Sequence, residues 1–281
     1  MKKVMVAKSA GFCWGVKRAF DKVLETVKKQ EGGEQVYTYG PLIHNPQAVE
    51  MLEKKGVEVL EEMPRAICGT VFIRTHGLSP CARESLKKSG ARICDATCPD
   101  VGIIQGLVRK HVRKGYHTII VGNKEHPEVN ALLGYAEGKG VAVLTPEEIK
   151  KLPTNWTNVC VVAQSTQKED KFEELVGVIK SIYPNAIIFN TICSSTTERQ
   201  EEVRSLAREV DAMVVVGGYN SANTAKLTQI SREIGTPTFH IETEEELNAS
   251  DFKDFDVIGI TAGSSTPSWL IDRVIQKLSL F

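Results

Sequence analysis

The chain has 281 residues, of which 42% are apolar, so it can bury one large core or two to three small ones. Lysine plus arginine equals aspartate plus glutamate at 35 each, and this balance excludes a strong field that would attract nucleic acid or an anionic membrane surface. No apolar run is long enough to span a membrane, and an odd number of cysteines, seven, favours reduced thiols in the cytoplasm over a secreted disulfide framework.

Short β-rich runs alternate with helical patterns along the whole chain. Strands are expected at Val4–Ala7, Gln35–Tyr39, Val71–Arg74, Ala91–Cys94, Thr118–Val121, Val141–Leu144, Val159–Ala163, Ala186–Phe189, Met213–Val216, Thr238–Ile241 and Val257–Ile260. Helices are expected at Val16–Lys29, Gln47–Lys55, Ser79–Ser89, Val101–Lys114, Lys168–Ile182, Thr197–Val210, Ala222–Ile234 and Pro267–Leu278. This alternation is typical of βαβ units, in which parallel sheets are covered by helices. The expected fold class is therefore α/β.

Three cysteines, Cys13, Cys98 and Cys193, each stand where a strand gives way to a helix, and they are 85 and 95 residues apart. The dipole of a helix N-terminus favours the thiolate form of cysteine. Thiolates are soft ligands that select iron–sulfur clusters, zinc or copper. One such cysteine in each third of the chain suggests three similar units that place one ligand each at a common centre.

The other four cysteines fit ordinary structural roles. Cys68, Cys94 and Cys160 lie in or beside apolar runs, where a lone cysteine is typically a small buried hydrophobe. Cys81 falls in the first turn of an expected helix and is interpreted as inert.

Two further polar junctions follow each of the three cysteines, and each also lies after a strand and before a helix. They are marked by His44 and His76, by His126 and Ser165, and by Asn220 and Ser264. In parallel sheets such loops form the carboxyl-end edge where ligands collect, and the helix N-termini there suit anions. The pattern predicts three parallel-sheet α/β units around a pseudo-threefold axis, with a metal and an anionic ligand in the middle. Their expected bounds are 14–97, 98–192, and 193–281 together with 1–13.

Like the cysteines, the six histidines divide into three in the repeated loops and three elsewhere. Those in the repeated loops are His44, His76 and His126. Three histidines in corresponding loops indicate a cluster that binds an anion such as phosphate. By contrast, His111 lies in a helix rich in lysine and arginine and is expected at the solvated surface. His117 and His240 lie at the ends of strands and are interpreted as ordinary core or surface residues.

Glu128 lies two residues after His126, at the start of a helix. A glutamate there can simply interact with the helix dipole. Alternatively, it is a general acid within reach of a substrate, relayed by Ser165 or Thr166. Small polar residues before the later helices are either helix caps or donors to phosphate oxygens. These residues are Ser221, Asn223, Ser264 and Ser265.

The metal is not fixed by the cysteines alone. Three thiolates hold either zinc, with a histidine or water as the fourth ligand, or a 4Fe–4S cluster in which one iron lacks a protein ligand. The C-x2-C patterns of zinc ribbons and ferredoxins are absent, which weakens both standard structural interpretations. The dinucleotide and phosphate-loop motifs are also absent, so a redox enzyme of this kind must take electrons from an outside carrier.

Eight motifs, in order, resemble the LytB/IspH family of 4-hydroxy-3-methylbut-2-enyl diphosphate reductases: GFCWGVKRA, IHNP, THG, DATCP, HPEV, NTIC, NSANT and TAGSSTP. The resemblance covers essentially the whole chain. It implies a pseudo-threefold, clover-like arrangement of three α/β units around one central 4Fe–4S cluster with an open iron, with a 3Fe–4S form expected after oxidation. It also implies reductive dehydroxylation of an allylic diphosphate to isopentenyl and dimethylallyl diphosphate, the last step of the methylerythritol phosphate route. Electrons would come from an external carrier such as ferredoxin or flavodoxin.

The resemblance also implies a role for each matching residue. The implied cluster ligands are Cys13, Cys98 and Cys193. The implied diphosphate contacts are His44, His76, Ser221, Asn223 and Ser265, with Ser264 at the adjoining position. The residues implied near the reacting end of the substrate are His126, the proton donor Glu128, and the hydroxyl pair Ser165 and Thr166.

Three positions depart from the family pattern. Ala222 stands where a second serine is usual, which removes one potential phosphate donor. Ser165 stands where threonine is usual, but it retains the hydroxyl, and Trp14 replaces a small residue beside the first cysteine. Two alternatives stay open: a zinc hydrolase of a phosphorylated substrate, and a redox or metal sensor that binds a phosphorylated metabolite.

Overall fold

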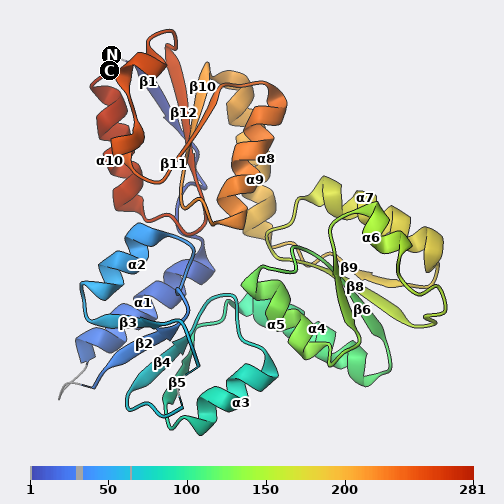
Figure 1. Ribbon diagram of the computed structural model, residues 1–281. Helices are drawn as coiled ribbons and strands as arrows, with labels where there is room; N and C mark the ends of the chain where they lie inside the picture. The colour runs from blue at the N-terminus through green and yellow to red at the C-terminus, as the bar shows by residue number, and fades with distance from the viewer. Residues whose placement is uncertain (1, 30–33, 64) are drawn as a thin grey trace. The chain divides into compact units, whose positions relative to one another are not determined.

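The computed structural model describes residues 2–29, 34–63 and 65–281, which form three four-stranded parallel sheets with helices against their faces (Figure 1). No helix within these ranges is long and apolar enough to cross a membrane. The chain divides into two compact bodies. The terminal body comprises Met1–Lys17, Ile43–Met51 and Ser194–Phe281, and the central body comprises Arg18–Leu42 and Leu52–Cys193.

Sheet A belongs to the terminal body and has the strand order β1-β12-β10-β11. Its strands are β1 (Lys3–Val6), β10 (Ala212–Val216), β11 (Thr238–Ile241) and β12 (Val257–Ala262). Figure 1 shows α10 on one face of this sheet and α8 with α9 on the other. These helices are α8 (Ser194–Glu209), α9 (Ala222–Ile234) and α10 (Ser268–Ser279).

Side chains of β10 alternate between the two helical layers. Val214 and Val216 pack in the cluster that contains Leu270 of α10. Val215 packs instead with Leu227 of α9. Because both faces are covered, the strand is apolar at every position, as the continuous run AMVVV shows.

Sheet C lies in the central body and has the strand order β7-β6-β8-β9. Its strands are β6 (His117–Val121), β7 (Gly140–Val143), β8 (Val159–Ala163) and β9 (Ile187–Phe189). The covering helices are α4 (Pro99–Arg113), α5 (Pro127–Tyr135), α6 (Pro146–Lys150) and α7 (Glu169–Ile182). Ile120 packs with Val108 of α4, whereas Ile119 packs with Leu175 of α7, so this sheet is also buried on both faces.

Sheet B, also in the central body, has the strand order β3-β2-β4-β5. Its strands are β2 (Val36–Tyr39), β3 (Val57–Leu60), β4 (Thr70–Ile73) and β5 (Arg92–Asp95). Val71 and Ile73 pack against Leu86 of α3 (Pro80–Lys88). Two further helices, α1 (Trp14–Lys29) and α2 (Pro46–Glu53), contribute residues to both bodies. Lys22 of α1 donates to the carbonyl of Asp95 at 2.9 Å, which ties this helix to the end of β5.

The three sheets share one topology. In each, the order of strands is second, first, third, fourth, counted along one α/β unit. Sheets B and C follow the chain directly, whereas in sheet A the fourth position is taken by the N-terminal strand β1, which pairs with β12. The expected α/β class with three similar units is therefore confirmed. The first and third strands are neighbours in each sheet, and successive strands are added on opposite sides of this pair. The position where the strand order reverses in this way is where α/β proteins bind ligands.

The expected strands all occur, and no end differs from its expected position by more than two residues. The strand β3 was not expected, because VEVL is a short run followed directly by acidic residues. Four helical elements also lack an expected range: α5, α6 and the short 3-10 helices η1 (Glu244–Glu246) and η2 (Ala249–Phe252). The short helix α6 follows a capping box, in which Thr145 and Glu148 bond each other's backbone.

Two expectations about single residues are wrong. His111 is buried, with 7% of its surface exposed, rather than solvated. It lies on the face of α4 that also carries Ile104 and Val108, and its ring packs against Phe189. Cys68 is exposed rather than buried, because it lies in the loop before β4 and outside the sheet.

Candidate functional site

The predicted site residues lie in the loops that follow the first, third and fourth strand of each sheet. All strands of a sheet are parallel, so these loops lie at its carboxyl edge. The loops after the fourth strands carry the three cysteines, and α1, α4 and α8 begin directly after them at Trp14, Pro99 and Ser194. The predicted residues divide between the two bodies.

Glu128 is the centre of the group in the central body. Its side chain is almost fully buried, with 1% exposed. The backbone N–H of Ser165 donates to Oε1 at 2.6 Å, and the hydroxyl of Ser165 donates to Oε2 at 2.6 Å. One residue thus binds both carboxylate oxygens, so the orientation of the acid is fixed by the fold.

His126 lies beside this carboxyl group as the N-cap of α5. Its Nδ1 accepts the backbone N–H of Glu128 at 3.2 Å, so Nδ1 carries no proton and Nε2 holds the ring hydrogen. Pro127 at the first helical position fits this start because its φ is already close to helical. The ring of His76 meets that of His126 edge-on, with centroids 5.2 Å apart. The sequence HPE therefore orients both a histidine and an acid at one helix start.

Two of the three cysteines are joined to the same group. The backbone N–H of Cys193 donates to the carbonyl of Ser165 at 2.9 Å. The sulfur of Cys193 lies 3.1 Å from Oδ2 of Asp100, which is in the first turn of α4. Cys98 is the N-cap of α4, two residues before Asp100, so both cysteines lie at the start of one helix. We call His76, Cys98, His126, Glu128, Ser165 and Cys193 the acid cluster.

The terminal body brings together a different set. The backbone N–H of Cys13 donates to the carbonyl of Ser264 at 3.1 Å. Ser265 donates its hydroxyl to the carbonyl of His44 at 3.0 Å. Gly218 approaches the same carbonyl so closely that a Cβ there would lie 2.8 Å from it. The loops after β10 and β12 therefore converge on the segment that carries His44, and the loop after β1 is bonded to the β12 loop through Ser264.

Asn223 and Ser221 complete this set at the start of α9. Ser221 is the N-cap, and its Oγ accepts from the N–H of Thr224 at 3.3 Å and from the Thr224 hydroxyl at 2.9 Å. Asn223 is 3% exposed, and neither atom of its side-chain amide has a hydrogen-bond partner among the described residues. Such a buried polar group costs about 1–3 kcal/mol, so its presence points to a ligand that supplies the partners. We call Cys13, His44, Ser221, Asn223, Ser264 and Ser265 the donor cluster.

Two residues that hold the Cys13 loop were missed by sequence analysis. Arg199 of α8 is buried and donates to the carbonyl of Gly11 at 2.8 Å. Glu202, one helical turn later, accepts the backbone N–H groups of Lys8 and Ser9 at 2.6 and 2.9 Å. Burial opposes ionisation of Glu202, but these bonds outweigh it and lower the pKa of its carboxyl. Neither contact has a local signal, because the partners are almost two hundred residues apart in the chain.

The second predicted hydroxyl residue of this loop is Thr166. It accepts a hydrogen bond from the side-chain amide of Gln164 at 3.1 Å, and its neighbour Ser165 donates its hydroxyl to Glu128. Trp14, beside Cys13, is 51% exposed, so its bulk is accommodated at the surface of the terminal body.

These features define an α/β protein whose parallel sheets present thiols, histidines and one buried acid from their carboxyl-end loops. The chain belongs to the LytB protein family, whose sequence profile matches residues 4–279.

Named relatives match over nearly their whole length. The chain is 46% identical to the 4-hydroxy-3-methylbut-2-enyl diphosphate reductase of Opitutus terrae over 98% of this chain and 99% of that protein. It is 44% identical to the same enzyme of Geobacter sulfurreducens over 99% and 98%. A solved structure titled as this reductase, the terminal enzyme of the non-mevalonate pathway, is 42% identical, with a TM-score of 0.74 over 100% of both chains. The Plasmodium falciparum reductase is 28% identical, with a TM-score of 0.92 over 99% of this chain and 88% of that one.

Proposed function

We propose that this chain catalyses the reaction after which these relatives are named. The substrate would be 4-hydroxy-3-methylbut-2-enyl diphosphate. Two electrons and two protons would replace its allylic hydroxyl by hydrogen, releasing water and giving isopentenyl or dimethylallyl diphosphate. This would be the last step of the methylerythritol phosphate route to isoprenoids. Family membership and full-length identity above 40% to named reductases support the assignment.

One observation in the structure carries the proposal. Ser165 binds both oxygens of the buried Glu128, and its own carbonyl accepts the N–H of Cys193. A thiol suited to a metal and an acid suited to proton transfer are therefore joined through a single residue. Reductive loss of a hydroxyl group requires both electrons and a proton at one carbon–oxygen bond, and this arrangement provides for both.

The thiols fit an iron–sulfur cluster. Cys13, Cys98 and Cys193 form no disulfide, are partly exposed, and are placed at helix starts, where the thiolate form is favoured. We propose that they hold one 4Fe–4S cluster and leave one iron without a protein ligand, with a 3Fe–4S form after oxidation. When bound, the cluster supplies electrons and a Lewis-acidic iron for the substrate oxygen.

The donor cluster would hold the diphosphate. Its side chains are mostly neutral, and the start of α9 adds free N–H groups and a positive dipole end. Asn223 would gain the partners that its buried amide lacks, and Ser221, Ser264 and Ser265 would add hydroxyl groups. His44 and His76 are proposed as further contacts. Hydrogen bonds to a charged group contribute about 1.5–3 kcal/mol each, so several such bonds account for binding without lysine or arginine.

Glu128 would deliver the proton that lets water leave. Its carboxyl group is held by Ser165 and lies beside His126. A general acid in this position contributes about 10²–10⁴-fold to the rate. We assign His126 and Thr166 to the same region as contacts to the reacting end of the substrate. Electrons would reach the protein from an external carrier such as a ferredoxin or flavodoxin in the cytoplasm.

The test is anaerobic purification followed by metal analysis and turnover. We expect iron and acid-labile sulfide, and consumption of the allylic diphosphate with an artificial reductant. Cys193→Ser should lose iron and activity, whereas Cys68→Ser, a change at an exposed thiol outside the site, should keep both. Zinc without iron would instead indicate a hydrolase, and tight binding of the diphosphate without turnover would indicate a sensor; either result refutes the proposal.

A further inference from the structure

The loop Gly217–Ser221 connects β10 to α9 and leads directly to Asn223. It is bonded to a segment that follows it in the chain, His240–Glu246. The Nε2 atom of His240 lies 2.9 Å from the carbonyl oxygen of Gly217. A carbonyl oxygen accepts only, so Nε2 is the donor.

Tyr219 makes further bonds to the same segment. Its backbone N–H donates to Oε1 of Glu242 at 2.8 Å, and its hydroxyl donates to Oε2 of Glu246. The rings of Tyr219 and His240 also pack together, with centroids 4.7 Å apart. The carbonyl of Gly217 and both the N–H and the side chain of Tyr219 are thus held by the segment His240–Glu246.

Glu246 links these contacts to the backbone. Its Oε1 accepts the N–H groups of Glu242 and Thr243 at 2.7 and 2.9 Å. Burial opposes ionisation of Glu246, but the bonds from Tyr219 and from these N–H groups outweigh it and lower the pKa of its carboxyl. The charged acceptor in turn raises the pKa of Tyr219 to about 12. The bond between them is therefore charge-assisted, which makes it stronger than a neutral one.

The glycines of the loop are tightly packed. Gly217 has a φ of 149°, and a Cβ there would lie 2.7 Å from the hydroxyls of Thr224 and Thr266. Gly218 is limited in the same way by the carbonyl of His44. Movement of the loop is consequently limited both by this packing and by the bonds of His240 and Tyr219.

We propose that Tyr219, His240 and Glu246 are positioning residues for the anion-binding end of the site. They hold the Gly217–Ser221 loop so that Ser221 and Asn223 meet a diphosphate group in a fixed arrangement. They act through the loop and not on the ligand. The identity of the full substrate rests on the proposed function, but the role in holding a diphosphate does not require turnover.

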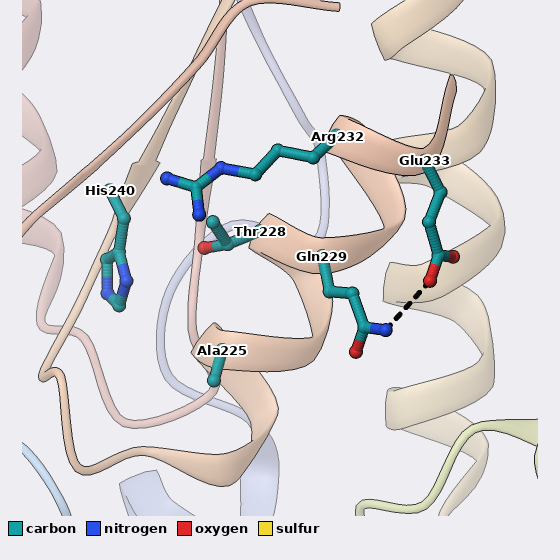
Figure 2. A pocket seen from close by; sticks show the side chains of 6 residues that line it. All are labelled: Ala225, Thr228, Gln229, Arg232, Glu233 and His240. Carbon is teal, nitrogen blue, oxygen red and sulfur yellow. Dashed lines mark hydrogen bonds between the residues drawn. The ribbon is translucent and has the colours of Figure 1, made fainter. Parts of the chain in front are cut away.

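His240 is accessible from a surface pocket of about 420 Å³. Figure 2 shows its ring opposite Arg232 and Thr228 of α9. Removal of the ring would enlarge this pocket and leave the Gly217 carbonyl without its donor. A small molecule could then enter and replace the ring, which makes chemical rescue a direct test.

The experiment measures the Kd of inorganic diphosphate by calorimetry, and KM and kcat for the allylic diphosphate, in anaerobically purified holoprotein. We expect His240→Ala to raise Kd and KM about three- to tenfold, with kcat changed less than about twofold. Imidazole should restore the Kd at about pH 8.5, whereas 1-methylimidazole, which is then neutral and has no N–H donor, should not. Tyr219→Phe should give a smaller increase of the same kind. Arg232→Ala, on the other wall of the pocket, is the matched control and should leave all three values unchanged.

Each outcome decides the matter. Unchanged Kd in folded His240→Ala and Tyr219→Phe would refute the positioning role. Equal rescue by both imidazoles would show that the ring only fills space, and an equal effect of Arg232→Ala would attribute the change to the pocket surface; both overturn the proposal. If wild-type protein binds inorganic diphosphate but does not turn over the allylic diphosphate, the proposed function fails while the Kd comparison still tests the loop.

Discussion

The acid cluster and the donor cluster differ in how their polar groups are satisfied. In the acid cluster, both carboxylate oxygens of Glu128 and the Nδ1 atom of His126 are bonded within the protein. In the donor cluster, the buried amide of Asn223 has no partner among the described side chains and backbone groups. The carboxyl group of Glu128 is therefore oriented before a ligand binds, whereas the amide of Asn223 requires a ligand for its hydrogen bonds. If the proposed function holds, substitutions should separate the two clusters as changes in kcat and in KM.

The largest effect is expected for Glu128→Gln, which keeps the shape of the side chain but removes the proton. We expect kcat to fall about 10²–10⁴-fold, with KM nearly unchanged. Glu173→Gln, at an exposed position of α7, is the matched control and should behave as wild type. Steady-state kinetics with purified, cluster-containing protein would check this. Normal turnover in Glu128→Gln would remove this residue from its assigned role.

The next effect is expected for Asn223→Leu, which replaces the amide by an apolar group of similar size. We expect KM to rise about tenfold or more, because hydrogen bonds to a charged group are lost, while kcat changes little. The thermal midpoint of the ligand-free protein should not fall, because two buried polar atoms without partners are removed. Asn185→Leu, at an exposed loop position, controls for added apolar surface. A large loss of ligand-free stability would show that Asn223 has a structural partner instead.

A smaller effect should follow from Ser165→Ala. This change deletes the hydroxyl bond to Glu128 but keeps the backbone N–H bond, so the acid loses one of its two contacts. We expect kcat to fall about fivefold to tenfold. Ser165→Thr retains the hydroxyl and should restore most of the rate. If serine, alanine and threonine give equal rates, the Ser165 hydroxyl does not orient the acid.

The smallest effect concerns the pH dependence of stability. The pKa of Tyr219 is raised to about 12 by Glu246, above its ordinary value of about 10. The contribution of Tyr219 to stability is therefore fully present below about pH 10 and is lost as the pH rises toward 12. Thermal midpoints should thus fall more steeply over this range for wild type than for Tyr219→Phe. Parallel curves would show that the tyrosine hydroxyl does not couple to Glu246.

Several features were predictable because their signals are local. The apolar runs of β6, β8 and β10 identify buried strands, and the polar residues that follow them mark the carboxyl-end loops. The same local pattern of a strand followed by a helix predicts that Cys13, Cys98 and Cys193 lie before helices. These signals predict which loops carry the site and which residue types they present.

Other features depend on contacts between distant segments. The bonds of Arg199 and Glu202 to the Cys13 loop join segments that are far apart in the chain, so no local sequence pattern predicts them. His240 was expected to be an ordinary residue because its partner, the Gly217 carbonyl, carries no side-chain signal. His111 was assigned to the surface from its charged neighbours, although its helical spacing with Val108 and Ile104 places it inward.

The pairing of β1 with β12 has a consequence for biosynthesis. Lys3–Val6 is synthesised about 250 residues before its partner Val257–Ile260. Cys13 follows β1 closely, so the loop that holds it gains its neighbour Ser264 only after that later segment has been made. The Cys13 loop therefore reaches its folded form late, and a nascent chain stalled before residue 257 would leave this segment open to proteases and chaperones.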